Sequence, residues 1–228
     1  MEGTQTPLSG AETLLIGLVV LAVVLLSLTW SVVQHFHVMA HEGMHAIAGW
    51  LSGGKVWSIE LKDNAEGATV VGVRPGPGDF MTTFLGYLGS SLFGLGAARL
   101  IHFGHIIVVL WIAALLLGLL LIRLKRSFGF LTVPLAGLVI FMVLKHMSHA
   151  GDIVAAYALT WFLLLSGVRG IAEDGINAGD AAQLRDSTRI PRMVWLALWL
   201  TGTLAAVIIG ARWMVHPAAL PPAGAAGP

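Results

Sequence analysis

The sequence predicts an all-α protein that crosses a membrane about seven times and carries one small β-hairpin. Hydrophobic residues make up 57% of its 228 residues and charged residues only 11%. The mean hydropathy is +0.84. Long apolar runs recur along the chain, as is typical of multi-pass membrane proteins. A single segment departs from this pattern, with two β-type runs around a turn.

Seven apolar runs approach or exceed the length needed to cross a hydrocarbon core of roughly 30 Å. The second run is the shortest, and a Gly-Gly pair ends it. The expected spans are Leu14 to about Val33, about His35 to Leu51, Phe80 to about Leu100, Ile106 to Ile122, Phe128 to Leu144, about Met147 to Val168, and Val194 to Met214.

Residues 55–73 are expected to form the hairpin. The composition of Val56–Leu61 and Ala68–Val73 favours two strands, and Lys62–Gly67 favours the turn between them. The Pro- and Gly-rich stretch 74–78 ends the second strand. Two interpretations stay open at this point. The hairpin is either a surface feature without a task or an exposed edge that pairs with an extended substrate segment.

The spans are expected to form one membrane domain, residues 1–216. The Ala/Gly/Pro-rich tail, residues 217–228, is expected to be disordered. Between the last two spans, Asn177–Thr188 is expected to form a short cytoplasmic helix with Asp180 as its N-cap, and no chemistry is assigned to it. No basic stretch precedes the first span, so we expect no cleaved signal peptide.

The distribution of Lys and Arg predicts the orientation in the cell membrane, because these residues collect in cytoplasmic loops. Cationic loops lie between the fourth and fifth spans and between the sixth and seventh. Seven crossings would place both loops, the N-terminus and the hairpin in the cytoplasm, and the C-terminus outside. The cations are Arg123, Lys125, Arg126, Arg169, Arg185, Arg189 and Arg192, with Lys55, Lys62 and Arg74 near the hairpin.

Charge and cysteine content exclude several classes of partner and site. The net charge is +1, with no interleaved basic and aromatic patch, so nucleic acid is excluded and the lipid bilayer is the evident surrounding. The chain has no cysteine. Any metal must therefore be held by imidazoles and carboxylates.

The pentapeptide His41-Glu42-Gly43-Met44-His45 predicts a zinc site within the apolar helices. Residues i and i+4 share one face of a helix, so His41 and His45 can hold one Zn²⁺. Glu42 is placed to act as a general base on a water at the metal. The chemistry that this pattern indicates is hydrolysis. The alternative is a pair of histidines bonded to the backbone, which would leave a buried carboxylate beside them uncompensated.

A catalytic zinc site needs a third protein ligand, and acids inside the apolar runs are few. Of the twelve acidic residues, only Glu42 and Asp152 fall within these runs. Because charged groups at bilayer depth are functional by default, Asp152 is the leading candidate.

Histidines provide the alternatives for this position. His149 and His146 precede Asp152 closely, and His149 is better suited to support the carboxylate from behind. His37 lies two turns before His45, about 12 Å along the helix, which is too far for one ion. It more reasonably bonds a neighbouring element.

These residues together resemble the site-2 protease family of intramembrane zinc metalloproteases. The resemblance covers about residues 30–170 and rests on the motif at 41–45, the hairpin after it and the late intramembrane Asp152. The family's Asp lies in an Asn-Pro and Leu-Asp-Gly pattern, whereas Asp152 follows Gly and no Asn-Pro is present. Gly86–Ser91 is similar to the family's Gly-rich stretch, although close helix packing also accounts for its small residues. The resemblance implies a compact, divergent bacterial branch without a PDZ module.

The expected function is zinc-dependent hydrolysis of peptide bonds in membrane-spanning proteins, with Glu42 as base and His41, His45 and Asp152 as ligands. The resemblance implies a single-span substrate, such as an anti-sigma factor or a membrane-tethered regulator. One alternative is a non-proteolytic zinc-binding membrane protein, either a metal carrier or a pseudoprotease. Another is a metalloprotease acting on prenylated termini, which would require more carboxylates near the metal.

Overall fold

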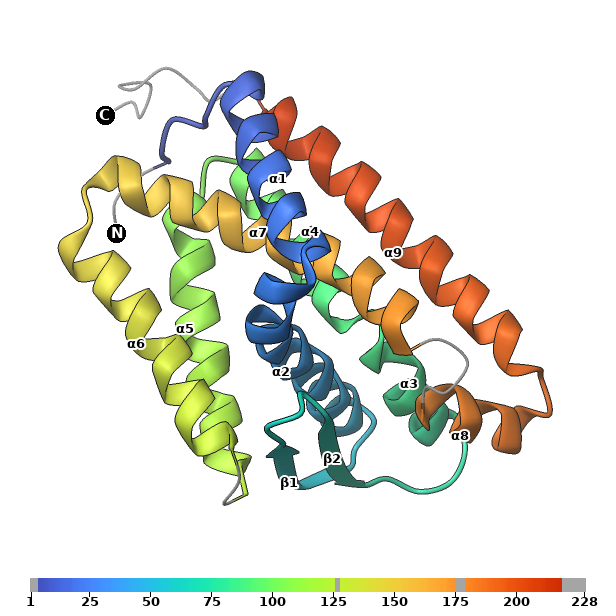
Figure 1. The fold of residues 1–228 in the computed structure, drawn as a ribbon. Coiled ribbons are helices and arrows are strands. Elements are labelled where there is room, and N and C mark those ends of the chain that lie inside the picture. Colours follow the sequence, from blue (N-terminus) through green and yellow to red (C-terminus); the bar gives the residue numbers. More distant parts are fainter. Residues whose placement is uncertain (1–3, 126–127, 175–178, 219–228) are drawn as a thin grey trace, which may run out of the picture.

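The fold is a bundle of helices around one central helix, with the hairpin at one end (Figure 1). A computed structural model describes residues 4–125, 128–174 and 179–218. The described elements are α1 (Gly10–Leu25), α2 (Ser27–Leu51), β1 (Lys55–Leu61), β2 (Gly67–Gly72), α3 (Pro77–Gly86), α4 (Gly89–His102), α5 (Ile106–Arg123), α6 (Gly129–His146), α7 (His149–Asp174), α8 (Gly179–Thr188) and α9 (Arg192–Val215).

The number of candidate membrane spans is smaller than the seven predicted. Helices α5, α6, α7 and α9 are each long and apolar enough to cross a membrane. Two pairs pass the same test only together: α1 with α2, bent by 99°, and α3 with α4, bent by 75°. The described residues therefore hold four candidate spans, or up to six if each bent pair counts as one. The first two predicted spans fall within the first bent pair, and the break at Leu26 lies inside the first of them.

The bend between α1 and α2 lies at Leu26, whose backbone is extended (φ −74°, ψ 122°). The Thr29 hydroxyl donates to the carbonyls of Val23 at 2.5 Å and Leu26 at 3.0 Å. A hydroxyl at a helix break can satisfy carbonyls that would otherwise be left without partners in an apolar setting. The chain thus changes direction without a proline or a glycine.

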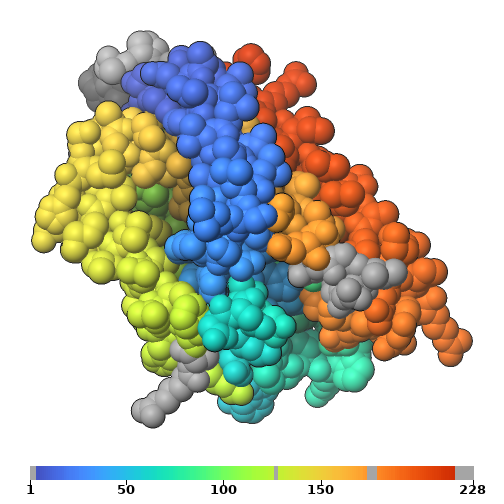
Figure 2. All heavy atoms as spheres, in the orientation of Figure 1, coloured from blue at the N-terminus to red at the C-terminus, as the bar shows by residue number. Residues whose placement is uncertain are grey.

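Helix α7 is the centre of the bundle and packs against α1, α4 and α9 (Figure 1). Tyr157 and Leu164 are fully buried there, and the indole of Trp161 donates to the carbonyl of Thr13 at 3.0 Å. At Gly94 a side chain would lie 2.8 Å from the backbone nitrogen of Leu164, so glycine is what lets α4 approach α7. In Figure 2, α1 and the start of α2 cover the face of the bundle that is turned to the viewer.

The two ends of the bundle are distinct. At one end, Gln5 donates its backbone N–H to the carbonyl of Gly104, and Ala218 donates to the carbonyl of His102. At the other end, the backbone N–H of Lys125 donates to the carbonyl of Ile59 in β1. The N-terminal segment and the hairpin therefore lie at opposite ends of the bundle. If each bent pair is one span, α1 and α2 together make a single crossing between them, in place of the two crossings expected.

The hairpin forms as predicted, and it covers part of α2. Strands β1 and β2 are antiparallel, with Ile59 opposite Thr69 and an irregularity between Val56 and Ser58. Ile59 is buried in a cluster with Met39 of α2 and Leu120 of α5. The predicted short helix at 177–188 is also found, as α8. The predicted tail lies almost entirely outside the described residues.

Candidate metal centre

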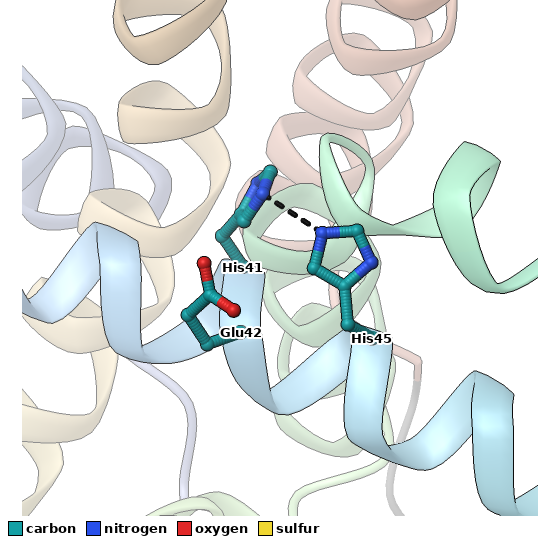
Figure 3. Close-up of side chains that lie close together, drawn as sticks. All are labelled: His41, Glu42 and His45. Atoms are coloured by element: carbon teal, nitrogen blue, oxygen red, sulfur yellow. Dashed lines mark hydrogen bonds between the residues drawn. The ribbon is translucent and has the colours of Figure 1, made fainter. Parts of the chain in front are cut away.

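Helix α2 places His41 and His45 one turn apart on the same face, as the motif predicts (Figure 3). Their Nε2 atoms lie 3.0 Å apart. With the Glu42 carboxylate, they form a group whose ligand atoms all lie within 4.8 Å of one another. Glu42 and His45 are buried. The local helix therefore gathers three groups that can bind a metal ion or act beside one.

The orientation of His45 is fixed by α3. Its Nδ1–H donates to the carbonyl of Thr82 at 2.8 Å, because a carbonyl oxygen can only accept. This leaves Nε2 to face His41, and histidines that bind metals commonly have such a hydrogen bond from the second ring nitrogen. The imidazole also rests on Gly86, where a Cβ would lie 2.3 Å from Cε1. The bend between α3 and α4 thus places a residue without a side chain against the His45 ring.

Asp180, in the first turn of α8, completes the group. Its Oδ2 lies 3.4 Å from Nε2 of His41 and 3.1 Å from Nε2 of His45. Ligand atoms about 2.0–2.1 Å from a tetrahedral zinc ion lie about 3.3 Å apart, so the spacing of the three atoms fits this metal. The Asp180 Oδ2 is buried and lacks the geometry of a hydrogen bond to either ring. A metal ion bound between the three atoms would give the buried carboxylate oxygen the partner that it lacks.

The charge state of Asp180 suits a ligand. Burial on its own would raise the pKa of this carboxyl, but the two imidazoles beside it outweigh burial and lower the pKa well below its usual range. The carboxylate is therefore ionised at neutral pH, as metal binding requires.

Asp152, the predicted third ligand, is not part of this group. It lies in the first turn of α7, whereas Gly170 near the other end of that helix packs against His37. Eighteen residues of helix separate the two positions, about 27 Å. Its neighbours His149 and His146 are exposed and equally remote. Asp152 is buried, and its Oδ1 has no hydrogen-bond partner among the described residues.

The sequence does not single out Asp180, because this residue lies outside the apolar runs. Asp180 belongs to a short helix outside the spans and lies in its first turn rather than at the N-cap. The helix is held by Ala181 and Leu184, which are buried in a cluster with Trp195 and Trp199. The spacing of Ala181 and Leu184 was the available signal, since residues three apart share one face of a helix and give α8 a buried side.

Glu42 is held by the hairpin. Its Oε2 accepts a hydrogen bond from the Thr69 hydroxyl at 2.6 Å. Gly67, two residues earlier on β2, lies so close that a Cβ would meet Oε1 at 2.4 Å. Side chains two apart share one face of a strand, so this face of β2 forms a wall beside the carboxylate.

A polar cavity of about 660 Å³ connects these groups. It is lined by α2, β2, α3 and the ends of α7 and α8. Tyr87 packs edge-on against His41, with ring centroids 4.7 Å apart. His37 also faces this cavity, and its Nδ1 and the Ser90 hydroxyl share a hydrogen bond of 2.8 Å. The stretch Gly86–Ser91 therefore packs closely against α2 and borders the cavity as well.

Comparison with known proteins gives one match. The model of the Peptidase M50B-like family matches residues 14–210. No curated protein and no solved structure matches the chain. The match covers most of the chain, including α2, the hairpin and α8. The chain therefore belongs to the Peptidase M50B-like family, within the site-2 proteases.

Proposed function

We propose that this protein is a zinc metalloendopeptidase that hydrolyses peptide bonds of membrane-spanning proteins. The ligands are His41, His45 and Asp180, and Glu42 is the general base. The observation that carries the proposal is the convergence of two Nε2 atoms and one carboxylate oxygen within 3.4 Å, beside the buried Glu42. Membership of a peptidase family supports the reaction class.

Each residue beside the candidate metal centre has a separate role in the proposed reaction. Zinc bound here would supply a Lewis acid that polarises the scissile carbonyl and acidifies a water molecule. Glu42 takes a proton from that water and passes it to the leaving amine. Thr69 holds the Glu42 carboxylate by its Oε2, so the other oxygen, Oε1, is left for proton transfer. Thr82 keeps His45 in the tautomer that presents Nε2.

The hairpin is the proposed binding surface for the substrate chain. The outer side of β1 meets the turn after α5, where Ile59 pairs with Leu124. Strand β2 instead borders the cavity through Gly67, Ala68 and Thr69. An extended segment could add to this strand, and a transmembrane helix must unwind before its amides can be attacked.

The substrate class and the orientation are further parts of the proposal. We propose a single-span membrane protein, such as an anti-sigma factor or a membrane-tethered regulator, as substrate. The hairpin end is proposed to face the cytoplasm, because cations gather there. The described cations at this end are Lys55, Lys62, Arg74, Arg123, Lys125, Arg185, Arg189 and Arg192, against Arg99, Lys145 and Arg212 at the other, with Arg169 beside Glu173 in the last turns of α7.

The alternative is a zinc-binding membrane protein without proteolytic activity. A metal carrier would need a path of further ligands, whereas the described residues hold a single group of His, Asp or Glu suited to a metal ion, the one around His41, Glu42 and His45. A pseudoprotease would keep the metal but cleave nothing.

The deciding experiment compares wild type and Glu42→Gln on a panel of labelled single-span proteins in vesicles. Wild type should cleave at least one of them, and the variant should be slower by roughly 10²–10⁴-fold with unchanged zinc content, because only the base is lost. Full cleavage by the variant, or zinc binding without cleavage by wild type, would overturn the proposal.

A further inference from the structure

A second cavity lies behind the motif helix. It has a volume of about 930 Å³ and shares no lining residue with the polar cavity. The face of α2 that carries Ala40, Gly43 and Ile47 forms one wall. Helices α5, α6 and α7 form most of the others, with smaller contributions from α1, α4 and β1. We call it the apolar groove. In Figure 2 the surface is hollowed between α1 and α6, where α5 lies behind.

The two polar residues of the groove lie at the same end. Among the described residues that line it, all are apolar except Lys55 and Arg123. Lys55 begins β1 and Arg123 ends α5, so both stand at the hairpin end. Ile59 pairs with Leu124, which places Lys55 about 13 Å along the strand from the end of α5. Two long cationic side chains can reach across that spacing to one phosphate.

Two tryptophans mark this end as interfacial. Trp50 is 68% exposed and Trp57 is 58% exposed. Lys55 stacks on Trp57, with Nζ 4.4 Å from the ring centroid. Exposed tryptophans gather where lipid headgroups meet the hydrocarbon core. The cationic end of the groove therefore lies at headgroup level, and the rest extends into the acyl region.

The length of the groove favours a lipid chain over a membrane-spanning helix. Along α5 it runs from Leu110 to Arg123, about 20 Å of helix. This is close to the thickness of one leaflet, roughly 15 Å, and well short of a full span of roughly 30 Å. A spanning helix would extend well beyond the groove, whereas the acyl chain of one lipid matches its length.

We propose that the apolar groove binds one anionic phospholipid from the leaflet at the hairpin end. The phosphate lies between Lys55 and Arg123, and an acyl chain runs along α5 behind Gly43. A neutral or zwitterionic lipid can place the same chain there but gains less from the two cations. Each cation close to an anionic headgroup is worth a few-fold in affinity, so the pair gives a preference of roughly 25-fold.

Native mass spectrometry tests the proposal without any measurement of cleavage. The full chain is reconstituted in nanodiscs that contain equal amounts of phosphatidylglycerol and phosphatidylcholine. The protein is then released in the mass spectrometer, and the lipids that remain bound to it are counted. Wild type should retain phosphatidylglycerol preferentially. The double variant Lys55→Gln/Arg123→Gln should lose most of that preference. Lys145→Gln/Arg212→Gln removes the same charge at the other end of the bundle and should keep it.

Two further variants separate the remaining occupants. Ala113→Trp fills the groove and should reduce retention of both lipids. A photo-cross-linking residue at Leu119, in the presence of a labelled single-span peptide, should capture lipid. Capture of the peptide, equal retention of the two lipids by wild type, or the same loss in the matched control pair would overturn the proposal.

Discussion

Asp180 reaches the two histidines from the first turn of α8, a helix of ten residues outside the apolar spans. A short side chain on a short helix can be a ligand only if the helix is held firmly. Here Ala181 and Leu184 provide that attachment, since both are buried among aromatic residues of α9 and α3–α4. The position of Asp180 in the candidate metal centre thus depends on the apolar packing of its two neighbours in α8.

The identity of the third ligand is the first prediction at this scale. Asp180→Asn should abolish stoichiometric zinc binding, because the neutral amide is a far weaker ligand than a carboxylate. Asp152→Asn is the matched control and should retain one zinc per chain. Zinc content of the purified variants, measured by inductively coupled plasma mass spectrometry, decides between them. Loss of zinc in Asp152→Asn alone would restore the ligand suggested by the apolar runs.

Thr69 gives a second prediction, on the general base. Thr69→Val removes the hydroxyl that donates to Glu42 and should lower kcat by roughly 10- to 100-fold, since a hydrogen bond to a charged group is worth about 1.5–3 kcal/mol. KM and zinc content should change little. Thr69→Ser keeps the hydroxyl and should keep most of the rate. An equal loss in both variants would mean that strand packing matters and the hydrogen bond does not.

At the scale of elements, the sequence predicts the parts that depend on local pattern. The hairpin and the short helix before the last span form where expected, and the motif helix ends as expected at Leu51 but begins at Ser27 instead of His35. The bend at Leu26 could not be predicted, because no glycine or proline lies there and the Thr29 hydroxyl bonds the carbonyls at the break. The bend near Tyr87 lies between Gly86 and Gly89, but small residues are equally compatible with a straight, closely packed helix. The approach of Asp180 to the two histidines could not be predicted for a related reason, because it depends on how α8 docks.

The docking of α8 can be tested directly. Leu184→Ala should weaken the attachment of α8 by about 2–5 kcal/mol, the usual cost of such a cavity in a core. Zinc should then be removed by chelators at lower concentration, while membrane insertion stays normal. Arg185→Ala, an exposed neighbour on the same helix, should behave as wild type. Chelator titration with a colorimetric zinc indicator gives the comparison, and identical curves would contradict this view of α8.

At the scale of the whole molecule, the N-terminal segment and the hairpin mark opposite ends of the bundle. The chain contains no cysteine, so single cysteines can report the two sides. In intact cells, Thr6→Cys should react with a membrane-impermeant maleimide, and Asn64→Cys should react only after permeabilisation. Both positions reacting under the same condition would contradict the six-crossing arrangement. The reverse pattern would keep the arrangement but invert the orientation.

The three donor atoms of the metal centre come from two distant parts of the chain, α2 and α8. A metal ion bound by them would close a loop of more than a hundred residues that contains the hairpin and the central helix. Closure of a long loop removes conformational freedom from the unfolded chain, as a disulfide does. This cysteine-free protein would then hold its first and last thirds together with a cross-link that forms and opens with the supply of zinc.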